Sequence, residues 1–251
     1  MRRFAPRLLC LAVLSVAGPA ARAADLVVSA AASLTNALRE VAPLFEAAHP
    51  GTRVRFNFGA SGALLQQIVR GAPVDVFASA DQETMDQAQA QGAVRPSARR
   101  DFASNALVVV VPAAAERAPR SLADLERPEY RRVAVGLPAS VPAGRYAKAA
   151  LEQAGLWARI EPRVIGAQNV RQALDYAARG EVDAAFVYAT DAALLPDRVR
   201  VALVVPTSAP IVYPIAALEA APDAEAARRF VAFVLTPAAQ AALARHGFGR
   251  P

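Results

Sequence analysis

Cysteine and histidine are nearly absent from this 251-residue chain, which has one cysteine, Cys10, and two histidines, His49 and His246. Once the leader described below is removed, no disulfide, thiolate metal site or cysteine nucleophile can form. Each histidine precedes a Pro-Gly or a Gly at the end of a helical pattern, where the helix dipole favours a C-terminal cap. The sequence also lacks the H-E-x-x-H, Walker and G-x-G-x-x-G motifs. These absences argue against an enzyme, and we expect no cofactor.

Long apolar runs are also missing, since no run after the N-terminus approaches the eighteen or so residues of a membrane-spanning helix. At the N-terminus, Arg2, Arg3 and Arg7 flank the start of a short apolar segment, residues 8–17, and Ala-Arg-Ala at 21–23 offers a cleavage site. This pattern predicts a signal peptide over residues 1–23 that is removed on export. Because the exported chain has no disulfide, we expect it in a periplasm-like space.

A strong charge of one sign is absent too. The whole chain has a formal net charge of +6, from 28 basic and 22 acidic residues. Four of the basic residues lie in the predicted signal peptide, so 24 basic and 22 acidic residues remain, for a net charge of +2. So small an excess gives no case for nucleic-acid binding.

What the chain does have is a regular alternation of short apolar segments with alanine-rich helical segments. This alternation predicts an α/β fold in which mostly parallel sheets are flanked by helices. The pattern occurs in two similar halves, which indicates two lobes with a ligand cleft between them. The expected strands span residues 26–29, 53–58, 74–78, 107–111, 133–136, 163–165, 184–188, 199–205 and 211–218, and the expected helices 34–48, 63–70, 82–91, 144–154, 170–179, 223–235 and 237–246.

Four of the predicted breaks from strand to helix contain small or polar residues. They are residues 31–36 (AASLTN), 58–63 (FGASGA), 141–146 (VPAGRY) and 167–171 (AQNVR). A helix start has backbone N–H groups without acceptors and the positive end of the helix dipole. Small residues let an oxyanion approach such a backbone closely. Four such starts, two in each half, could surround one small anion.

Single residues at these breaks allow two interpretations. Ser33 and Ser61 could donate hydroxyl hydrogen bonds to an anion or serve as ordinary helix N-caps. Ala143, between Pro142 and Gly144, could present a bare N–H or simply belong to a proline-led helix start. Tyr188, at the end of a buried strand, could point its hydroxyl at the cleft or bond to backbone in the core.

Several segments resemble the periplasmic molybdate-binding proteins of ABC transporters. The resemblance rests on residues 30–37 (AAASLTNA), 71–82 (GAPVDVFASADQ), 105–110 (NALVVV), 187–188 (VY), 245–248 (RHGF) and, most specifically, 141–148 (VPAGRYAK). It covers nearly all of the chain after residue 23.

The resemblance implies a two-lobed periplasmic binding protein of type II that captures molybdate, and tungstate, for a membrane permease and works as a monomer. It implies one lobe from residues 24–106 and 208–251 and another from residues 107–207. In such proteins neutral groups contact the oxygens of the anion, and no side chain binds the metal atom directly. The positions that match are Ser33, Ser61, Ala143, Val170 and Tyr188. The chain departs from the family pattern at Ala60, where many relatives have serine, and at Gln168-Asn169, which replaces an acidic pair.

Other interpretations remain open at this point. The same donors would suit another tetrahedral oxyanion such as sulfate. The segment 59–63 (GASGA) also resembles a hydrolase nucleophile elbow, which leaves a secreted serine hydrolase using Ser61 and His246 as an alternative. We expect Arg145 and Arg171 to form pairs at the rim of the site rather than touch the anion, and Asp81 and Asp191 to cap helices or tie the hinge.

Overall fold

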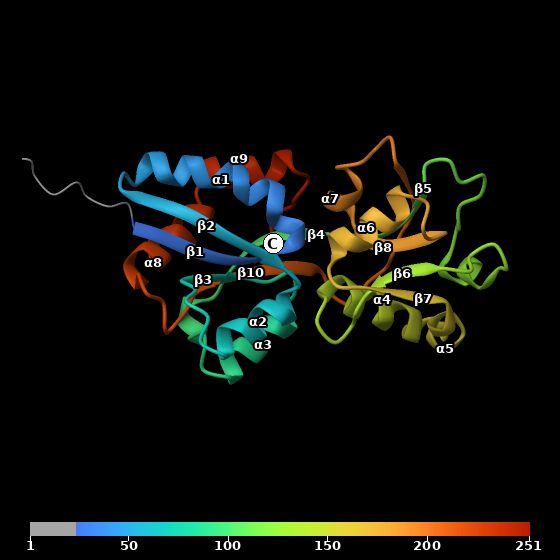
Figure 1. Cartoon of the computed structure of the whole chain (residues 1–251), viewed down its shortest axis with the longest axis horizontal. Helices are drawn as coiled ribbons and strands as arrows, with labels where there is room; N and C mark the ends of the chain where they lie inside the picture. The colour runs from blue at the N-terminus through green and yellow to red at the C-terminus, as the bar shows by residue number, and fades with distance from the viewer. Residues whose placement is uncertain (1–23) are drawn as a thin grey trace, which may run out of the picture.

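The computed structural model describes residues 24–251, which form two α/β lobes side by side (Figure 1). The predicted signal peptide and Cys10 lie outside the described residues. Each lobe is built on one five-stranded sheet. Among the described residues, no helix has both the length and the apolar character needed to cross a membrane.

The sheet of the first lobe has the strand order β2-β1-β3-β10-β4. Strand β1 runs parallel to β2 and β3, whereas β10 runs antiparallel to β3 and β4. The carboxyl ends of β1, β2 and β3 therefore meet at one edge of the sheet. These strands are β1 (Ala24–Ala31), β2 (Thr52–Gly59), β3 (Val76–Ala78), β4 (Arg100–Asn105) and β10 (Ile211–Ala217).

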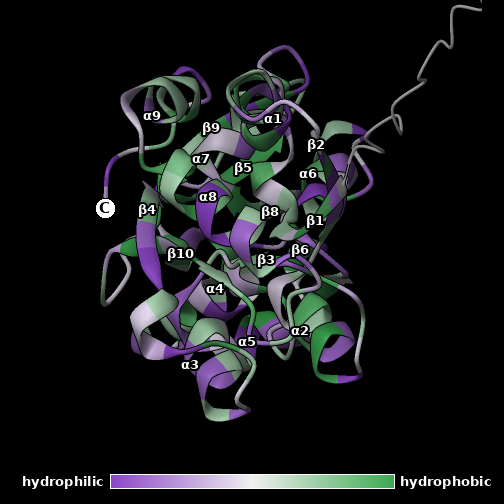
Figure 2. Ribbon diagram, turned by 90° about the vertical axis from the view of Figure 1, so that its left-hand side faces the viewer, coloured by the Kyte–Doolittle hydropathy of each residue, from purple (hydrophilic) through white to green (hydrophobic). Residues whose placement is uncertain are grey.

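Helices cover both faces of this first sheet. In two perpendicular views α1 and α9 lie on one face and α2 and α3 on the other (Figures 1 and 2). Helix α1 packs on the sheet through an apolar face, because Leu38, Val41 and Phe45 recur at helical spacing and are all fully buried. These elements are η1 (Ala32–Leu34), α1 (Thr35–Ala48), α2 (Ser61–Val69), α3 (Gln82–Ala90), η2 (Pro96–Ala98), α8 (Ala224–Val234) and α9 (Pro237–Arg245).

The second lobe repeats this plan with the strand order β7-β6-β8-β5-β9. Strand β6 is parallel to β7 and β8, and β5 is antiparallel to β8 and β9. Its elements are β5 (Leu107–Pro112), η3 (Leu122–Glu126), β6 (Val133–Gly136), α4 (Pro142–Gln153), α5 (Trp157–Ile160), η4 (Glu161–Arg163), β7 (Val164–Ala167), α6 (Val170–Ala178), β8 (Ala184–Tyr188), α7 (Ala189–Ala192) and β9 (Val199–Val204).

The chain passes between the lobes twice. One crossing is at Ala106, between β4 and β5, and the other spans residues 205–210, between β9 and β10. Strand β10 therefore returns to the first sheet and lies between β3 and β4. The first lobe is discontinuous in sequence, whereas the second sheet is formed by one continuous stretch.

The predicted fold class is confirmed, and the structure adds elements that the sequence pattern did not predict. Strand β4 has the sequence RDFASN, in which only Phe102 and Ala103 are buried. It lacks an alternating apolar pattern, and its pairing with β10 stabilises it instead. The short helices α5 and α7 also escaped prediction, since one turn is too short for a periodic pattern.

Candidate functional site

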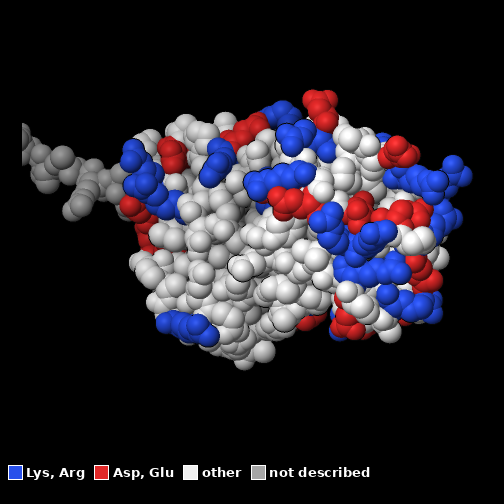
Figure 3. All heavy atoms as spheres, turned by 45° about the vertical axis from the view of Figure 1, so that its right-hand side comes forward, with Lys and Arg blue, Asp and Glu red and all other residues white. Residues whose placement is uncertain are grey.

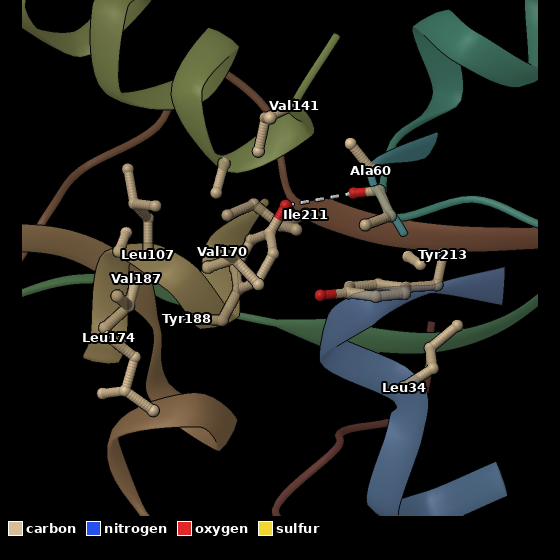
Figure 4. Packing of buried hydrophobic residues seen from close by; sticks show 14 of the residues in the cluster. Leu34, Ala60, Leu107, Val141, Val170, Leu174, Val187, Tyr188, Ile211 and Tyr213 are labelled. Atoms are coloured by element: carbon tan, nitrogen blue, oxygen red, sulfur yellow. Dashed lines mark hydrogen bonds between the residues drawn. The ribbon is translucent and has the colours of Figure 1, made fainter. Parts of the chain in front are cut away.

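A small cavity lies where the strand-to-helix breaks of the two lobes face each other. Four elements start at its walls, namely η1 after β1, α2 after β2, α4 after β6 and α6 after β7. The cavity has a volume of about 200 Å³ when space open to solvent is included, and all five residues expected at the site line it. Figure 4 shows Tyr188, Val141 and Val170 on one side of this space and Ala60 on the other. The lining residues are Ala31, Ala32, Ser33, Gly59, Ala60, Ser61, Ala80, Val141, Pro142, Ala143, Asn169, Val170 and Tyr188.

The lining of this cavity, rather than its size, suits a small anion. In the measure used for ligand pockets, which span roughly 300–1,000 Å³, the volume of this cavity is about 10 Å³, so the lobes leave about the space of one water molecule. A larger hollow of about 1130 Å³, with space open to solvent included, lies on the first lobe, beside Arg95, Arg228 and Leu235. We assign the site to the smaller cavity because it alone contains the expected residues among the described hollows, and because helix starts from both lobes point to it.

The two serines are not ordinary N-caps. Ser61 is the first residue of α2, and the N-cap residue Ala60 has no side-chain cap bond. Ser33 lies inside η1, before the start of α1. Both side chains are buried. The Ser61 hydroxyl accepts a hydrogen bond from Ala80 N–H at 3.0 Å, and the Ser33 hydroxyl bonds to the Tyr213 hydroxyl at 3.1 Å.

Ala143 and Val170 bring backbone groups to the cavity. Ala143 is the second residue of α4, and Val170 is the first residue of α6. The N–H groups of a first helical turn have no acceptor within the helix, so they remain available to a ligand. The Asn169 side chain caps α6 by accepting from Gln172 N–H at 3.1 Å. This cap does not involve the N–H of Val170, which remains available to a ligand.

Tyr188 combines the two interpretations left open by its sequence position. It is buried and lines the cavity, and its hydroxyl donates to the Ala80 carbonyl of the other lobe at a long 3.4 Å. Burial raises the pKa of the Tyr188 hydroxyl well above its ordinary value, with smaller contributions from neighbouring tyrosines and aspartates. The hydroxyl therefore stays protonated, and donating to a ligand requires its single proton to turn away from the Ala80 carbonyl.

Arg145, on α4, forms an ion pair that crosses between the lobes. Its Nη2 lies 2.6 Å from Asp81 Oδ2, and its Nε lies 2.9 Å from the same oxygen. Nη2 also donates to the Thr84 hydroxyl at 2.6 Å. Asp81 caps α3 by accepting from Thr84 N–H with its other oxygen.

Arg171, on α6, pairs with Asp191 of its own lobe at 2.5 Å and reaches the other lobe through two further bonds. These bonds go to the carbonyl of Ser33 at 3.1 Å and to Asn36 Oδ1 at 3.0 Å. Burial raises the pKa of Asp191 to about 6, although Arg171 opposes the shift. Neither Arg145 nor Arg171 belongs to the cavity lining, and Asp191 caps α7, in agreement with the expected rim and capping roles.

The hydrolase alternative has no support in this geometry. No histidine belongs to the cavity lining in the described part of the chain. His246 is the C-cap residue of α9, and its Nε2 lies 2.7 Å from a Glu40 oxygen. His49 caps α1, where its Nδ1 lies 3.1 Å from the Phe45 carbonyl oxygen. Residues 24–251 also contain no cluster of three or more histidine, cysteine and acidic side chains that could hold a metal ion.

The sequence pattern missed four residues that shape the site. Tyr213, on β10, contacts Ser33 from 180 residues away, and Asn105 contacts Tyr213. Gly62 and Ser140 bring the lobes together through an N–H to carbonyl bond of 3.0 Å. A Cβ atom on Gly62 would lie 2.9 Å from the Ser140 backbone. The only hint for Tyr213 was a hydroxyl-bearing residue in an otherwise apolar strand.

Two α/β lobes that face each other across a small cavity lined by hydrogen-bond donors define a solute-binding protein rather than an enzyme. The chain belongs to the family of bacterial extracellular solute-binding proteins, whose pattern matches residues 26–249. This result confirms the resemblance described above and the prediction of a binding protein.

Individual relatives agree with this assignment. The molybdate-binding protein ModA of Escherichia coli is 36% identical over 241 residues, which cover 93% of this chain and 93% of that protein. The structure of the Azotobacter vinelandii periplasmic molybdate-binding protein superposes with a TM-score of 0.77 at 26% identity, covering 90% of this chain and 99% of the other. The sulfate-binding protein SubI of Mycobacterium tuberculosis superposes with a TM-score of 0.81 at 22% identity, covering 90% and 87%, which shows a shared fold.

Proposed function

We propose that this protein binds molybdate, and tungstate, in the cavity between its lobes and delivers it to the permease of an ABC transporter. The observation that carries the proposal is the set of neutral donors around the cavity, from residues Ser33, Ser61, Ala143, Val170 and Tyr188. The identity to ModA proteins from several bacteria supports the choice of ligand.

The physical chemistry of a fully deprotonated dianion matches such a site. Each of its oxygens accepts hydrogen bonds and none donates, so a lining of O–H and N–H groups satisfies it without a positive side chain. A hydrogen bond to a charged group contributes roughly 1.5–3 kcal/mol, so six would give about 9–18 kcal/mol before the cost of closure and dehydration. A net value of about 10 kcal/mol corresponds to binding between micromolar and nanomolar.

We propose further that residues 24–106 with 208–251 and residues 107–207 move as two bodies that open to admit the anion. Opening would expose the cavity, which the lobes enclose in the structure described here. We also propose that residues 1–23 are a cleaved signal peptide, that the mature protein works in the periplasm, and that it is a monomer. N-terminal sequencing and light scattering of the exported protein test these statements.

Isothermal titration calorimetry with molybdate, tungstate, sulfate and phosphate tests the proposed ligand. We expect tight, saturable binding of molybdate and tungstate and much weaker binding of sulfate and phosphate. Tight binding of sulfate without binding of molybdate would overturn the assignment and favour a sulfate receptor. Because the sulfate-binding fold superposes as well as the molybdate-binding one, this measurement decides what the fold alone leaves open.

Substitutions in the lining then test the site. Ser33→Ala and Tyr188→Phe should each weaken molybdate binding by about 1–3 kcal/mol, because one oxygen of the anion loses its donor. Unchanged affinity in both variants would remove these residues from the site.

A further inference from the structure

A row of mostly buried polar groups leads from the crossing between the lobes at Ala106 to Ser33. The Ser33 hydroxyl lies 3.1 Å from the Tyr213 hydroxyl, which lies 3.2 Å from Asn105 Nδ2. The same Nδ2 donates to the Thr190 hydroxyl of the second lobe at 2.9 Å. Tyr213 is fully buried, and neither it nor Asn105 belongs to the cavity lining. The Tyr213 ring also packs edge-on against Tyr188, with ring centroids 5.7 Å apart, a contact that Tyr213→Phe would keep. The Tyr213 hydroxyl reaches the cavity lining only through Ser33.

The backbone sets the orientation of the Asn105 amide. The N–H of Ala106 donates to Asn105 Oδ1 at 2.9 Å, so this side-chain atom must be the carbonyl oxygen. The NH₂ group then faces Tyr213 and Thr190 and donates one hydrogen to each hydroxyl oxygen. Tyr213 accordingly accepts a hydrogen bond from Asn105.

The proton of Tyr213 then has one acceptor available. Among the described residues, the hydroxyl of Tyr213 contacts only Asn105 Nδ2 and Ser33 Oγ, and Nδ2 cannot accept. Burial raises the pKa of Tyr213 well above its ordinary value, so the hydroxyl keeps its proton. Because a buried donor without an acceptor is costly, the proton goes to Ser33 Oγ. The Ser33 hydroxyl can then direct its own proton into the cavity.

We propose that Tyr213, held by Asn105, is a positioning residue that makes the Ser33 hydroxyl a donor toward the bound anion. The inference rests on the proposed function and adds to it an expected selectivity against an oxyanion that is protonated at this position. The backbone orients the Ser61 hydroxyl in the same way, since its oxygen accepts from Ala80 N–H and its proton remains available to the cavity. Both serines are thus set as donors, one by backbone and one by side chains.

A double-mutant cycle tests the proposal, with molybdate affinity measured by calorimetry for wild type, Ser33→Ala, Tyr213→Phe and the double variant. We expect each single variant to weaken binding by about 10-fold, and the double variant to bind within about two-fold of Ser33→Ala. The effect of Tyr213 should vanish in the absence of Ser33, because it acts only through that hydroxyl. Tyr130→Phe, which changes a buried tyrosine outside the cavity lining, should bind as wild type.

The variant Asn105→Asp provides a second test of the proposal and leaves the Tyr213 side chain unchanged. The carboxylate replaces the donor with an acceptor, so Tyr213 should donate to it and Ser33 should turn its proton toward Tyr213. We expect molybdate binding at least as weak as in Tyr213→Phe, with a Tm of the ligand-free protein within a few degrees of wild type. A merely structural role would lower the Tm instead and would add to the effect of Ser33→Ala.

The outcomes separate this inference from the proposed function. If wild type binds molybdate and the two substitutions act independently, or if Tyr213→Phe binds as wild type, the positioning role is wrong and the proposed function stands. If wild type binds sulfate instead, the same cycle is run with sulfate, and the same two results decide. If wild type binds none of the four oxyanions, both the function and the inference are overturned.

Discussion

The two rims of the cavity join the lobes in different ways. At the α4 rim (Gly62, Asp81, Ser140 and Arg145), the guanidinium and its carboxylate belong to different lobes, so their ion pair exists only while the lobes touch. At the α6 rim (Ser33, Asn36, Arg171 and Asp191), the ion pair lies within the second lobe, and only the bonds to the Ser33 carbonyl and Asn36 cross over. The Arg145 ion pair therefore depends on closure, whereas the Arg171 ion pair mainly stabilises its own lobe.

Basic and acidic side chains also mix on the surface of the second lobe. Figure 3 shows blue and red groups side by side across the face of the second lobe. Pairs on an exposed surface contribute little, typically up to about 1 kcal/mol. The Asp81–Arg145 and Asp191–Arg171 pairs differ from these because their carboxylates are buried. Substitutions of Arg145 and Arg171 should therefore have measurable effects that test the difference between the two rims.

Arg145→Ala should give the largest loss of affinity. The closed form would enclose the Asp81 carboxylate, which is 4% exposed, without its cation, whereas an open form would leave that carboxylate in water. We expect molybdate binding to weaken by about 100-fold, with little change in the Tm of the ligand-free protein, because removing one member of a buried pair is costly. Calorimetry and thermal unfolding measure the two quantities.

The matched control for this variant is Arg159→Ala, which removes an exposed partner of Glu126 in the same lobe. It should change neither quantity. An Arg145→Ala protein that binds molybdate as tightly as wild type would contradict the assignment of this pair to closure.

Arg171→Ala should have the opposite effect, with a large loss of stability and a small loss of affinity. Asp191 is fully buried in the second lobe, so the loss of its partner should destabilise the ligand-free protein by about 2–3 kcal/mol. This value lies below that of a fully buried pair because the Arg171 side chain is 24% exposed. Affinity should fall by less than about 10-fold, since only two bonds across the lobes disappear.

Urea unfolding and calorimetry on the same preparation separate these effects. Arg179→Ala, which affects an exposed pair with Glu181 after the end of α6, serves as the control. If Arg171→Ala left stability unchanged and reduced affinity as much as Arg145→Ala, the two rims would be equivalent and the comparison wrong.

Gly62→Ala should have a smaller effect that is confined to the α4 rim. The new methyl group would approach the Ser140 backbone to 2.9 Å, and backbone cannot move aside as a flexible side chain can. We expect the lobes to close less completely and affinity to fall by about 10-fold. Small-angle scattering with saturating molybdate should show a larger radius of gyration than wild type.

Gly166→Ala is the control for this substitution. Its methyl group would meet the end of the Leu137 side chain, which is exposed and can turn away. Its molybdate affinity should match that of wild type. Equal scattering profiles for Gly62→Ala and wild type would show that the contact with Ser140 does not limit closure.

Raising the pH should have the smallest effect. Burial holds the pKa values of Tyr188 and Tyr213 well above the usual value for tyrosine, so both hydroxyls keep their protons in mildly alkaline solution. Between pH 7 and about pH 9, molybdate affinity should therefore vary by less than about two-fold. A steep loss of affinity over this range, measured by calorimetry, would mean that a donor of the site is being deprotonated.

Local patterns in the sequence were sufficient for much of this architecture. The alternation of apolar and alanine-rich segments predicted most strands and helices, and the breaks at Ser33, Ser61, Ala143 and Val170 proved to converge on one cavity. These features depend on neighbours within a few residues, which a single sequence records.

The parts that escaped prediction depend on contacts between distant segments. Strand β4 has no apolar alternation and exists because β10 pairs with it. The bond between Tyr213 and Ser33 joins residues 180 positions apart, and the role of Gly62 becomes visible only when Ser140 of the other lobe lies against it. The spacing of residues along the sequence does not indicate such contacts, because they depend on how the two sheets are placed in space.

The placement of β10 has a consequence for the order in which the lobes are completed. All five strands of the second sheet lie between Leu107 and Val204, so its sequence is complete before β10 emerges during synthesis. The first sheet waits for Ile211–Ala217 to enter between β3 and β4. A chain truncated after residue 206 would thus retain one whole sheet and leave a gap in the other, so the lobe formed by the N-terminal strands is the last to be finished.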